Sequence, residues 1–303
     1  MLLLNQSSLF GVVSLSDRAQ KNKHSDAPIG VFDSGIGGLS VVAELQLLLP
    51  NESIIYLADT AHVPYGTRTD EEIRTLTACA VEWLYQKGCK AVVVACNTAS
   101  AFSLSHLRAK YGETFPVIGL VPAVKPAVQL SKNKKIGVLA TQGTLRGTLL
   151  KEVIAEVAVP AGVEVITVMS PALVPFVEAG EQNSVECYAE LTRVLTPLAE
   201  AGVAELVLGC THYPFLHQSI HHIFPNVFHL LDSGAAVAKQ TARVLLQHEL
   251  LTTAKEANDL SCFVTGNVDP AKRVIEHLIE RTFTVTKAEY PVECLETGEL
   301  KAI

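Results

Sequence analysis

The sequence lacks the features that would place it in several protein classes at once. Its seven cysteines form no CxxC pair and are odd in number, which opposes a disulfide framework and a zinc site built from thiolates. No apolar run approaches the roughly 18 residues of a membrane span, and the first ten residues lack the charged region and cleavage site of a signal peptide. We therefore expect a cytoplasmic protein with reduced thiols, no metal and no membrane partner.

Positive charge is also scarce. Lys and Arg number 24 against 31 Asp and Glu, which gives a formal net charge of −7. Nucleic acids and anionic membranes bind basic surfaces, so neither is an expected partner. The chain is instead rich in apolar side chains. Of its 303 residues, 49% are hydrophobic, enough for a large core in one elaborate domain or two smaller ones.

Two similar stretches each place a cysteine at the end of an apolar run. Residues 91–100 read AVVVACNTAS, and residues 205–214 read ELVLGCTHYP. A run that is apolar at every position predicts a strand covered on both faces of a parallel sheet. Cys96 and Cys210 would then lie at the carboxyl ends of strands, where ligands bind in open α/β sheets. A following helix N-terminus would lower the pKa of each cysteine from its free value of about 8.5.

This pattern leaves two interpretations open. A single cysteine at a strand end is more often a small buried hydrophobe than a reactive group. Two cysteines at matching positions, followed by the polar pairs Asn97-Thr98 and Thr211-His212, make a structural and a functional role about equally plausible.

A glycine-rich turn follows the first predicted strand. Residues 33–38 read DSGIGG between a strand from Ile29 and a helix near residues 39–49. A dinucleotide site is one interpretation, because Asp59 lies where a ribose-binding acid is expected. It is the weaker one, because Ser40 holds the third glycine position and Asp33 would place a carboxylate beside the pyrophosphate. We favour backbone amides that face a small anion at the helix N-terminus.

A second α/β series begins after the prolines near residues 119–126. It has a strand over residues 134–140, a turn at 141–144 and a helix expected over 146–155. This turn corresponds to the Asp33 turn of the first series. The sequence therefore predicts two α/β halves of comparable design, each with a thiol strand and a small-residue turn.

Two thiols that face one cleft can act as a base and an acid. A thiol titrates close enough to neutral pH to be prepared in either state. Removing a proton from one face of a stereocentre and returning it to the other face inverts the centre, and this scheme requires no cofactor. His212 could assist Cys210, and Asp33 could assist Cys96.

Six motifs in order resemble bacterial glutamate racemases of the aspartate/glutamate racemase family. They span about residues 29–281 and are DSGIGG at Asp33, DTAHVPYG at Asp59, CNTAS at Cys96, ATQGT at Ala140, FVEAG at Phe176 and GCTHYP at Gly209. The resemblance implies a cofactor-independent racemase that interconverts L- and D-glutamate and supplies D-glutamate for peptidoglycan.

The resemblance also implies the site residues. Cys96 and Cys210 would be the acid–base thiols, with Cys96 deprotonating D-glutamate and Cys210 deprotonating L-glutamate. Asp33, Glu178 and His212 would assist them, although nothing in the local pattern distinguishes Glu178 from an ordinary surface acid. Thr141 and Thr144 are expected nearby. Substrate contacts would come from Asp33, Ser34, Tyr65, Gly66, Asn97, Thr98, Thr211 and His212.

The implied fold is two related open α/β domains with largely parallel sheets and the active site in the cleft between them. The first domain would take residues 29–118 and 232–285, and the second residues 119–231. Residues 1–28 would form a flexible extension and residues 286–303 a surface tail. Extended family members resemble those activated by a uridine-linked peptidoglycan precursor, which makes such a precursor a hypothetical partner. The oligomeric state does not follow from the sequence.

Two alternatives remain at this stage. Aspartate and hydantoin racemases of the same superfamily also use paired thiols, although the HVPYG and CTHYP motifs favour glutamate. A non-catalytic binding protein, or a nucleotide-dependent oxidoreductase that uses the glycine turn, would keep its function without either cysteine.

Overall fold

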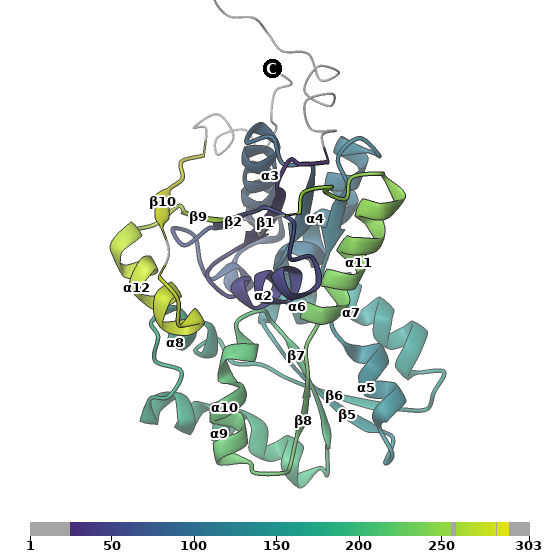
Figure 1. Ribbon diagram of the computed structural model, residues 1–303. Helices are drawn as coiled ribbons and strands as arrows, with labels where there is room; N and C mark the ends of the chain where they lie inside the picture. Colours follow the sequence, from purple (N-terminus) through teal and green to yellow (C-terminus); the bar gives the residue numbers. More distant parts are fainter. Residues whose placement is uncertain (1–24, 256–258, 283, 291–303) are drawn as a thin grey trace, which may run out of the picture.

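The computed structural model describes residues 25–255, 259–282 and 284–290. Most of the predicted N-terminal extension and the end of the predicted tail lie outside these residues. The described chain forms two bodies, one above the other in Figure 1, and each is built around its own sheet.

The first body contains a six-stranded sheet in the order β10-β9-β2-β1-β3-β4, and all its strand pairs are parallel. Its elements are β1 (Ile29–Asp33), α2 (Leu39–Leu48), β2 (Ile54–Ala58), the 3₁₀ turn η1 (Tyr65–Thr67), α3 (Asp70–Gln86), β3 (Ala91–Val94), α4 (Asn97–Tyr111), β4 (Val117–Gly119), α11 (Gly234–Gln247), β9 (Leu260–Val264), α12 (Val268–Ile279) and β10 (Val285–Lys287).

The second body contains a four-stranded parallel sheet in the order β6-β5-β7-β8. Its elements are α5 (Val124–Leu130), β5 (Lys135–Ala140), α6 (Gln142–Arg146), α7 (Thr148–Val153), the π-helical turn η2 (Ile154–Ala158), β6 (Glu164–Val168), α8 (Leu173–Glu178), α9 (Val185–Glu200), β7 (Glu205–Gly209), the 3₁₀ turn η3 (Tyr213–Leu216), α10 (His217–Ile223) and β8 (His229–Leu231).

The two sheets share one strand order. β2-β1-β3-β4 in the first corresponds to β6-β5-β7-β8 in the second, so β1 is the counterpart of β5 and β3 that of β7. This confirms the predicted fold class of two related, parallel α/β units. The predicted chain divisions at residues 118/119 and 231/232 stay a prediction.

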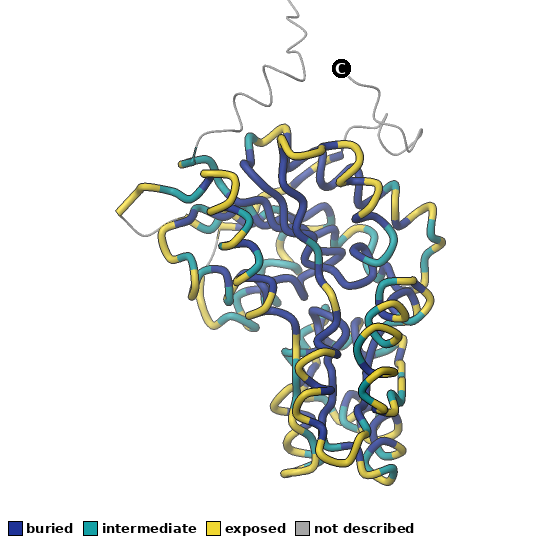
Figure 2. Tube along the Cα trace, turned by 90° about the vertical axis from the view of Figure 1, so that its right-hand side faces the viewer, coloured by how far each residue is buried: buried dark blue, intermediate teal, exposed yellow. Residues whose placement is uncertain are grey.

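Strand β3 shows why a continuous apolar run forms a central strand. Val92 and Val94 pack into the core beneath α3 and α4, whereas Val93 faces the core beneath α2, α11 and α12. Successive side chains point to opposite faces of a strand, so a strand covered on both faces must be apolar throughout. In Figure 2 the buried trace runs through the middle of each body, and the exposed residues lie on its outer turns.

Two local predictions differ from the structure. The helix expected over residues 146–155 begins instead at Gln142 and is interrupted at Gly147. A Cβ at Gly147 would lie 2.7 Å from the Cβ of Ala101, so this break lets the second body approach α4 closely. The cysteines also differ from the expectation of reduced thiols. Of the six cysteines within the described residues, five are free, but Cys79 is disulfide-bonded.

The predicted surface tail begins within a strand. β10 pairs in parallel with β9, and the next residues include Ala288 and Tyr290, which are only 2% and 9% exposed. Both pack into the core beneath α3. A strand of three residues is too short to show a periodicity in the sequence. The remaining residues of that tail, 291–303, lie outside the described part of the chain.

Candidate active site

The predicted site residues gather where the carboxyl ends of the two sheets meet. Asp33 ends β1 and Cys96 follows β3, its neighbour in the first sheet. In the second sheet Thr141 follows β5 and Cys210 follows β7. In both sheets the strand order reverses between these two strands, and open α/β sheets bind ligands at such switch points.

Both thiols line one small cavity between the bodies. Its volume is about 20 Å³, and seven of the eight predicted substrate contacts line it with the two cysteines. Asp33 and Glu178 do not line it but contact residues that do. The lining residues are Ser34, Pro64, Tyr65, Gly66, Cys96, Asn97, Thr98, Thr141, Val174, Cys210, Thr211 and His212.

Cys96 caps the N-terminus of α4. Its sulfur accepts a hydrogen bond from the Ala99 amide at 3.5 Å, and its thiol donates to Ser34 Oγ at 3.4 Å. The sequence predicted that the helix would lower the pKa of this thiol. Instead, burial and the neighbouring Asp33 carboxylate raise the pKa of Cys96 well above its ordinary value, and the contacts with Ser34 and Ala99 only partly oppose them. Cys96 is therefore a protonated thiol in this arrangement.

Asp33 is fully buried behind Cys96. Its carboxylate accepts hydrogen bonds from the Ser34 amide at 2.6 Å, from Ser34 Oγ at 3.2 Å and, across the cleft, from Thr211 Oγ1 at 3.0 Å. Burial raises the pKa of Asp33 to about 6, although His212 and the bond from Thr211 oppose this rise. Ser34 thus stands between the Asp33 carboxylate and the Cys96 thiol.

Cys210 has a different set of neighbours. His212 Nδ1 lies 3.6 Å from the Cys210 sulfur, and His212 Nε2 lies 2.5 Å from Glu178 Oε1. Burial alone lowers the pKa of His212, but the contacts with Cys210 and Glu178 outweigh burial and raise it well above its ordinary value. The ring is therefore protonated. The chain after Cys210 forms the short turn η3 before α10, so no α-helix begins at this thiol.

The glycine turn at residues 33–38 lets the two bodies approach each other closely. A Cβ at Gly35 would lie 2.0 Å from Glu178 Oε1, and one at Gly37 would lie 2.3 Å from His212 Nδ1. The Ile36 amide donates to Glu178 Oε1 at 2.7 Å. The anion that these backbone amides face is thus a carboxylate of the protein itself. Asp59, the acid of the dinucleotide alternative, is fully buried and hydrogen-bonded, so it is not available to a ribose.

Several polar contacts across the cleft were not singled out from the sequence. Ser40 Oγ donates to the Thr211 carbonyl at 3.0 Å. Thr98 Oγ1 lies 2.8 Å from Thr141 Oγ1 and 3.3 Å from Thr144 Oγ1, which forms a cluster of hydroxyls from both bodies. The ATQGT motif indicated that the two threonines of the second body, Thr141 and Thr144, lie near the site. No local pattern indicated the contact of Ser40, because its acceptor, the Thr211 carbonyl, is 171 positions away in the sequence.

Two classes of feature are missing from the described residues. No group of three or more His, Cys, Asp and Glu side chains there is placed to hold a metal ion. None of the helices there is long and apolar enough to cross a membrane.

The fold and the site together define a class of protein. Two α/β units of the same strand order, each ending a strand on a thiol at one shared cavity, are the architecture of an α/β isomerase that acts as a racemase. The family model described as Asp/Glu/Hydantoin racemase matches residues 30–241. The chain therefore belongs to the Asp/Glu/Hydantoin racemase family.

Individual relatives agree with this family. A glutamate racemase of Deinococcus radiodurans is 58% identical over 259 residues, which cover 86% of this chain and 88% of the relative. The structure of Escherichia coli glutamate racemase with L-glutamate and the activator UDP-MurNAc-Ala has a TM-score of 0.76 at 34% identity, covering 88% of this chain and 99% of that one. The Francisella tularensis glutamate racemase with D-glutamate has a TM-score of 0.74 at 30% identity, covering 86% and 97%.

Proposed function

We propose that this protein interconverts L- and D-glutamate, with Cys96 and Cys210 as the two acid–base groups. The observation that carries the proposal is the placement of the thiols. They follow corresponding strands of two like sheets and line the same cavity, so a substrate between them would meet one sulfur on each face. The glutamate racemases among the relatives support glutamate as the substrate.

The neighbours of the thiols support a direction for the first proton transfer. The protonated His212 ring contacts Cys210 and places a positive charge beside its sulfur, whereas Cys96 is held as a thiol. Cys210 would remove the Cα proton of L-glutamate, and Cys96 would donate its proton to the opposite face, which leaves D-glutamate and a Cys96 thiolate. This matches the assignment implied by the family resemblance. The reverse reaction begins from the opposite protonation states.

The cavity offers partners for the charged groups of an amino acid. Its carboxylates would be bound by hydroxyl and backbone donors, because no Lys or Arg of the described chain lines this cavity. The substrate ammonium group requires acceptors. Asn97 Oδ1 is buried there without a hydrogen-bond partner, and the ionised Asp33 carboxylate lies behind Ser34. A bound ammonium group would satisfy the Asn97 oxygen.

The size of the cavity requires movement. A volume of about 20 Å³ accommodates roughly one water molecule and not an amino acid. We infer that the two bodies separate for the substrate to enter. The contacts that cross the cleft, such as Glu178 to the Ile36 amide and Ser40 to the Thr211 carbonyl, must then break or lengthen.

Single cysteine variants test the proposal. A general acid or base contributes about 10²- to 10⁴-fold to a rate, so Cys96→Ala and Cys210→Ala should each lose at least that much racemase activity. Circular dichroism at the glutamate band would follow the loss of optical activity. Cys262→Ala is the matched control, since Cys262 is a buried free thiol in β9 away from the cavity. Wild-type racemisation by either active-site variant would exclude the two-thiol mechanism.

We further propose that the D-glutamate serves peptidoglycan synthesis in the cytoplasm and that a uridine-linked peptidoglycan precursor activates the enzyme. The support is the E. coli relative, whose structure contains the activator UDP-MurNAc-Ala. Activity would be measured with and without this precursor, for the full chain and for a chain that begins at residue 25. A rate unchanged by the precursor in the full chain would refute the activation.

A further inference from the structure

Asp59 is a buried carboxylate that the two-thiol mechanism does not use. It directly follows β2, and its amide donates to the carbonyl of Asp33 at 2.9 Å, which places it beside the active-site end of β1. Its side chain is 0% exposed. A buried carboxylate is costly unless other groups bond to it, so its partners show what its charge is used for.

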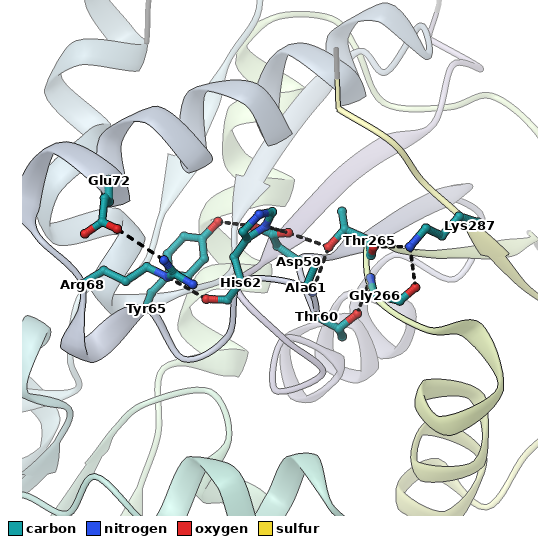
Figure 3. A network of polar contacts seen from close by, with 10 residues as sticks. All are labelled: Asp59, Thr60, Ala61, His62, Tyr65, Arg68, Glu72, Thr265, Gly266 and Lys287. Atoms are coloured by element: carbon teal, nitrogen blue, oxygen red, sulfur yellow. Dashed lines mark hydrogen bonds and ion pairs between the residues drawn. The ribbon is translucent and has the colours of Figure 1, made fainter. Parts of the chain in front are cut away.

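Three side chains bond to this carboxylate from two different segments (Figure 3). Tyr65 donates to Oδ2 at 2.5 Å, Thr265 donates to Oδ1 at 2.5 Å, and His62 Nδ1 lies 2.7 Å from Oδ1. Burial and the Asp59 charge raise the pKa of Tyr65 well above its ordinary value. Tyr65 therefore stays a phenol and remains a donor to Asp59.

One of these partners belongs to the wall of the active site. Tyr65 and Gly66 line the cavity between the thiols. A Cβ at Gly66 would lie 3.0 Å from the Cβ of Thr141 in the second body, so this short stretch of backbone also meets the opposite side of the cleft. A small displacement of the Tyr65-Gly66 backbone would change the shape of the substrate site.

A second partner, Thr265, connects the wall to the last strands of the first sheet. Thr265 follows β9, and besides donating to Asp59 its hydroxyl accepts from the Ala61 amide at 3.1 Å. Lys287 of β10 donates to the Thr265 carbonyl and, at 2.8 Å, to the Gly266 carbonyl. None of these β9 and β10 residues lines the cavity.

We propose that Asp59 is a positioning residue for the substrate: its carboxylate fixes the Tyr65-Gly66 wall against Thr265, and Lys287 holds Thr265 in place from β10. The inference rests on the proposed glutamate racemase activity. Replacing Asp59 should affect substrate binding most, because Asp59 bonds directly to Tyr65 of the wall. Replacing Thr265 should affect it less and replacing Lys287 least, because each lies one contact further from the wall.

The test compares KM and kcat for glutamate in both directions. Loss of a hydrogen bond to a charged group typically corresponds to a tenfold change or more, so Asp59→Asn should raise KM about tenfold or more, with a smaller change in kcat. Thr265→Val should raise KM severalfold, and Thr265→Ser, which keeps the hydroxyl, should restore it. Lys287→Met should raise KM about twofold. Thr286→Val, an exposed change on the same strand, is the control and should leave both constants unchanged.

A double variant separates positioning from general stability. If Thr265 acts through Asp59, the effects of Asp59→Asn and Thr265→Val on KM will be strongly non-additive. If the network is only structural, the variants will lower the melting temperature while the folded enzyme keeps wild-type KM, and the inference is wrong. Should Asp59→Asn fail to fold, the Val and Ser variants at Thr265 decide the question alone. A wild-type enzyme inactive on glutamate would instead refute the proposed function.

Discussion

Replacing Glu178 with Gln tests how the cleft prepares Cys210. Glu178 Oε1 is shared between His212 Nε2 at 2.5 Å and the Ile36 amide at 2.7 Å, so one carboxylate oxygen joins α8 of the second body to the glycine turn of the first. Gln keeps the shape of the side chain but removes its charge. The protonated His212 then loses its ionic partner, and its pKa falls because the Glu178 contact helps to raise it.

The size of the effect follows from that contact. A hydrogen bond to a charged group contributes about 1.5–3 kcal/mol, and about 1.4 kcal/mol corresponds to a tenfold change in rate. We therefore expect kcat/KM to fall about tenfold to a hundredfold. The two enantiomers have equal free energies, so kcat/KM must fall by the same factor in both directions, although kcat and KM taken singly are not bound by this equality.

The assay is racemisation of L- and D-glutamate across the pH range, with Glu181→Gln as the control. Glu181 is exposed, three residues after Glu178, so its replacement should leave the activity and its pH profile unchanged. In Glu178→Gln the profile should shift because His212 loses its proton at lower pH than in the wild type. Activity within twofold of the wild type, with an unshifted profile, would refute the role given to the Glu178–His212 pair.

Three further predictions concern the site and the core. Gly35→Ala should lower activity about tenfold or more, because the new Cβ would lie 2.0 Å from Glu178 Oε1 and would displace that carboxylate. The melting temperature should change little, since the end of the Glu178 side chain can rotate away. Wild-type activity would contradict this prediction. Asp33 has a pKa raised from 3.8 to about 6. The folded state therefore binds the Asp33 proton more tightly than the unfolded state, and this contribution to stability falls by about 2 kcal/mol as the pH rises from about 4 to 6. Asp33→Asn should remove this component from urea unfolding measured across that range, and a pH dependence identical to that of the wild type would show that the Asp33 pKa is not raised. Lys90→Met leaves Glu52 buried without its ion-pair partner and should cost about 3–5 kcal/mol of unfolding free energy. Activity per folded molecule should be unchanged, because Lys90 precedes β3 and Glu52 precedes β2, at the end of the sheet away from Cys96. A change below about 1 kcal/mol would contradict this.

Much of the architecture could be predicted because it depends on local patterns of apolar and polar residues. The apolar runs before Cys96 and Cys210 predict central strands, and the structure places both in corresponding positions of like sheets. The shared thiol cavity follows from that symmetry. β10 could not be predicted, because three residues carry no periodicity and its place depends on pairing with β9.

The contacts of the site were harder to predict than its residues. The Ile36 amide and Glu178 are separated by 142 positions, and no local pattern records such a contact. The glycines at Gly35 and Gly37 predicted backbone amides that face a small anion, since a turn that admits a carboxylate of the protein has the same composition as one that admits an external anion. The pKa of Cys96 was predicted to be lowered because the sequence shows the helix that follows it and not its burial.

The most direct test of the central claim is proton exchange during racemisation. The purified chain would be incubated with L-glutamate in D₂O, with L-aspartate as the control, while optical rotation and the Cα proton signal are followed together. Two-base racemisation of glutamate predicts that rotation falls to zero as deuterium enters Cα, for glutamate and not for aspartate. Constant rotation together with a retained Cα proton, in the presence and absence of the uridine-linked precursor, would contradict the proposed activity.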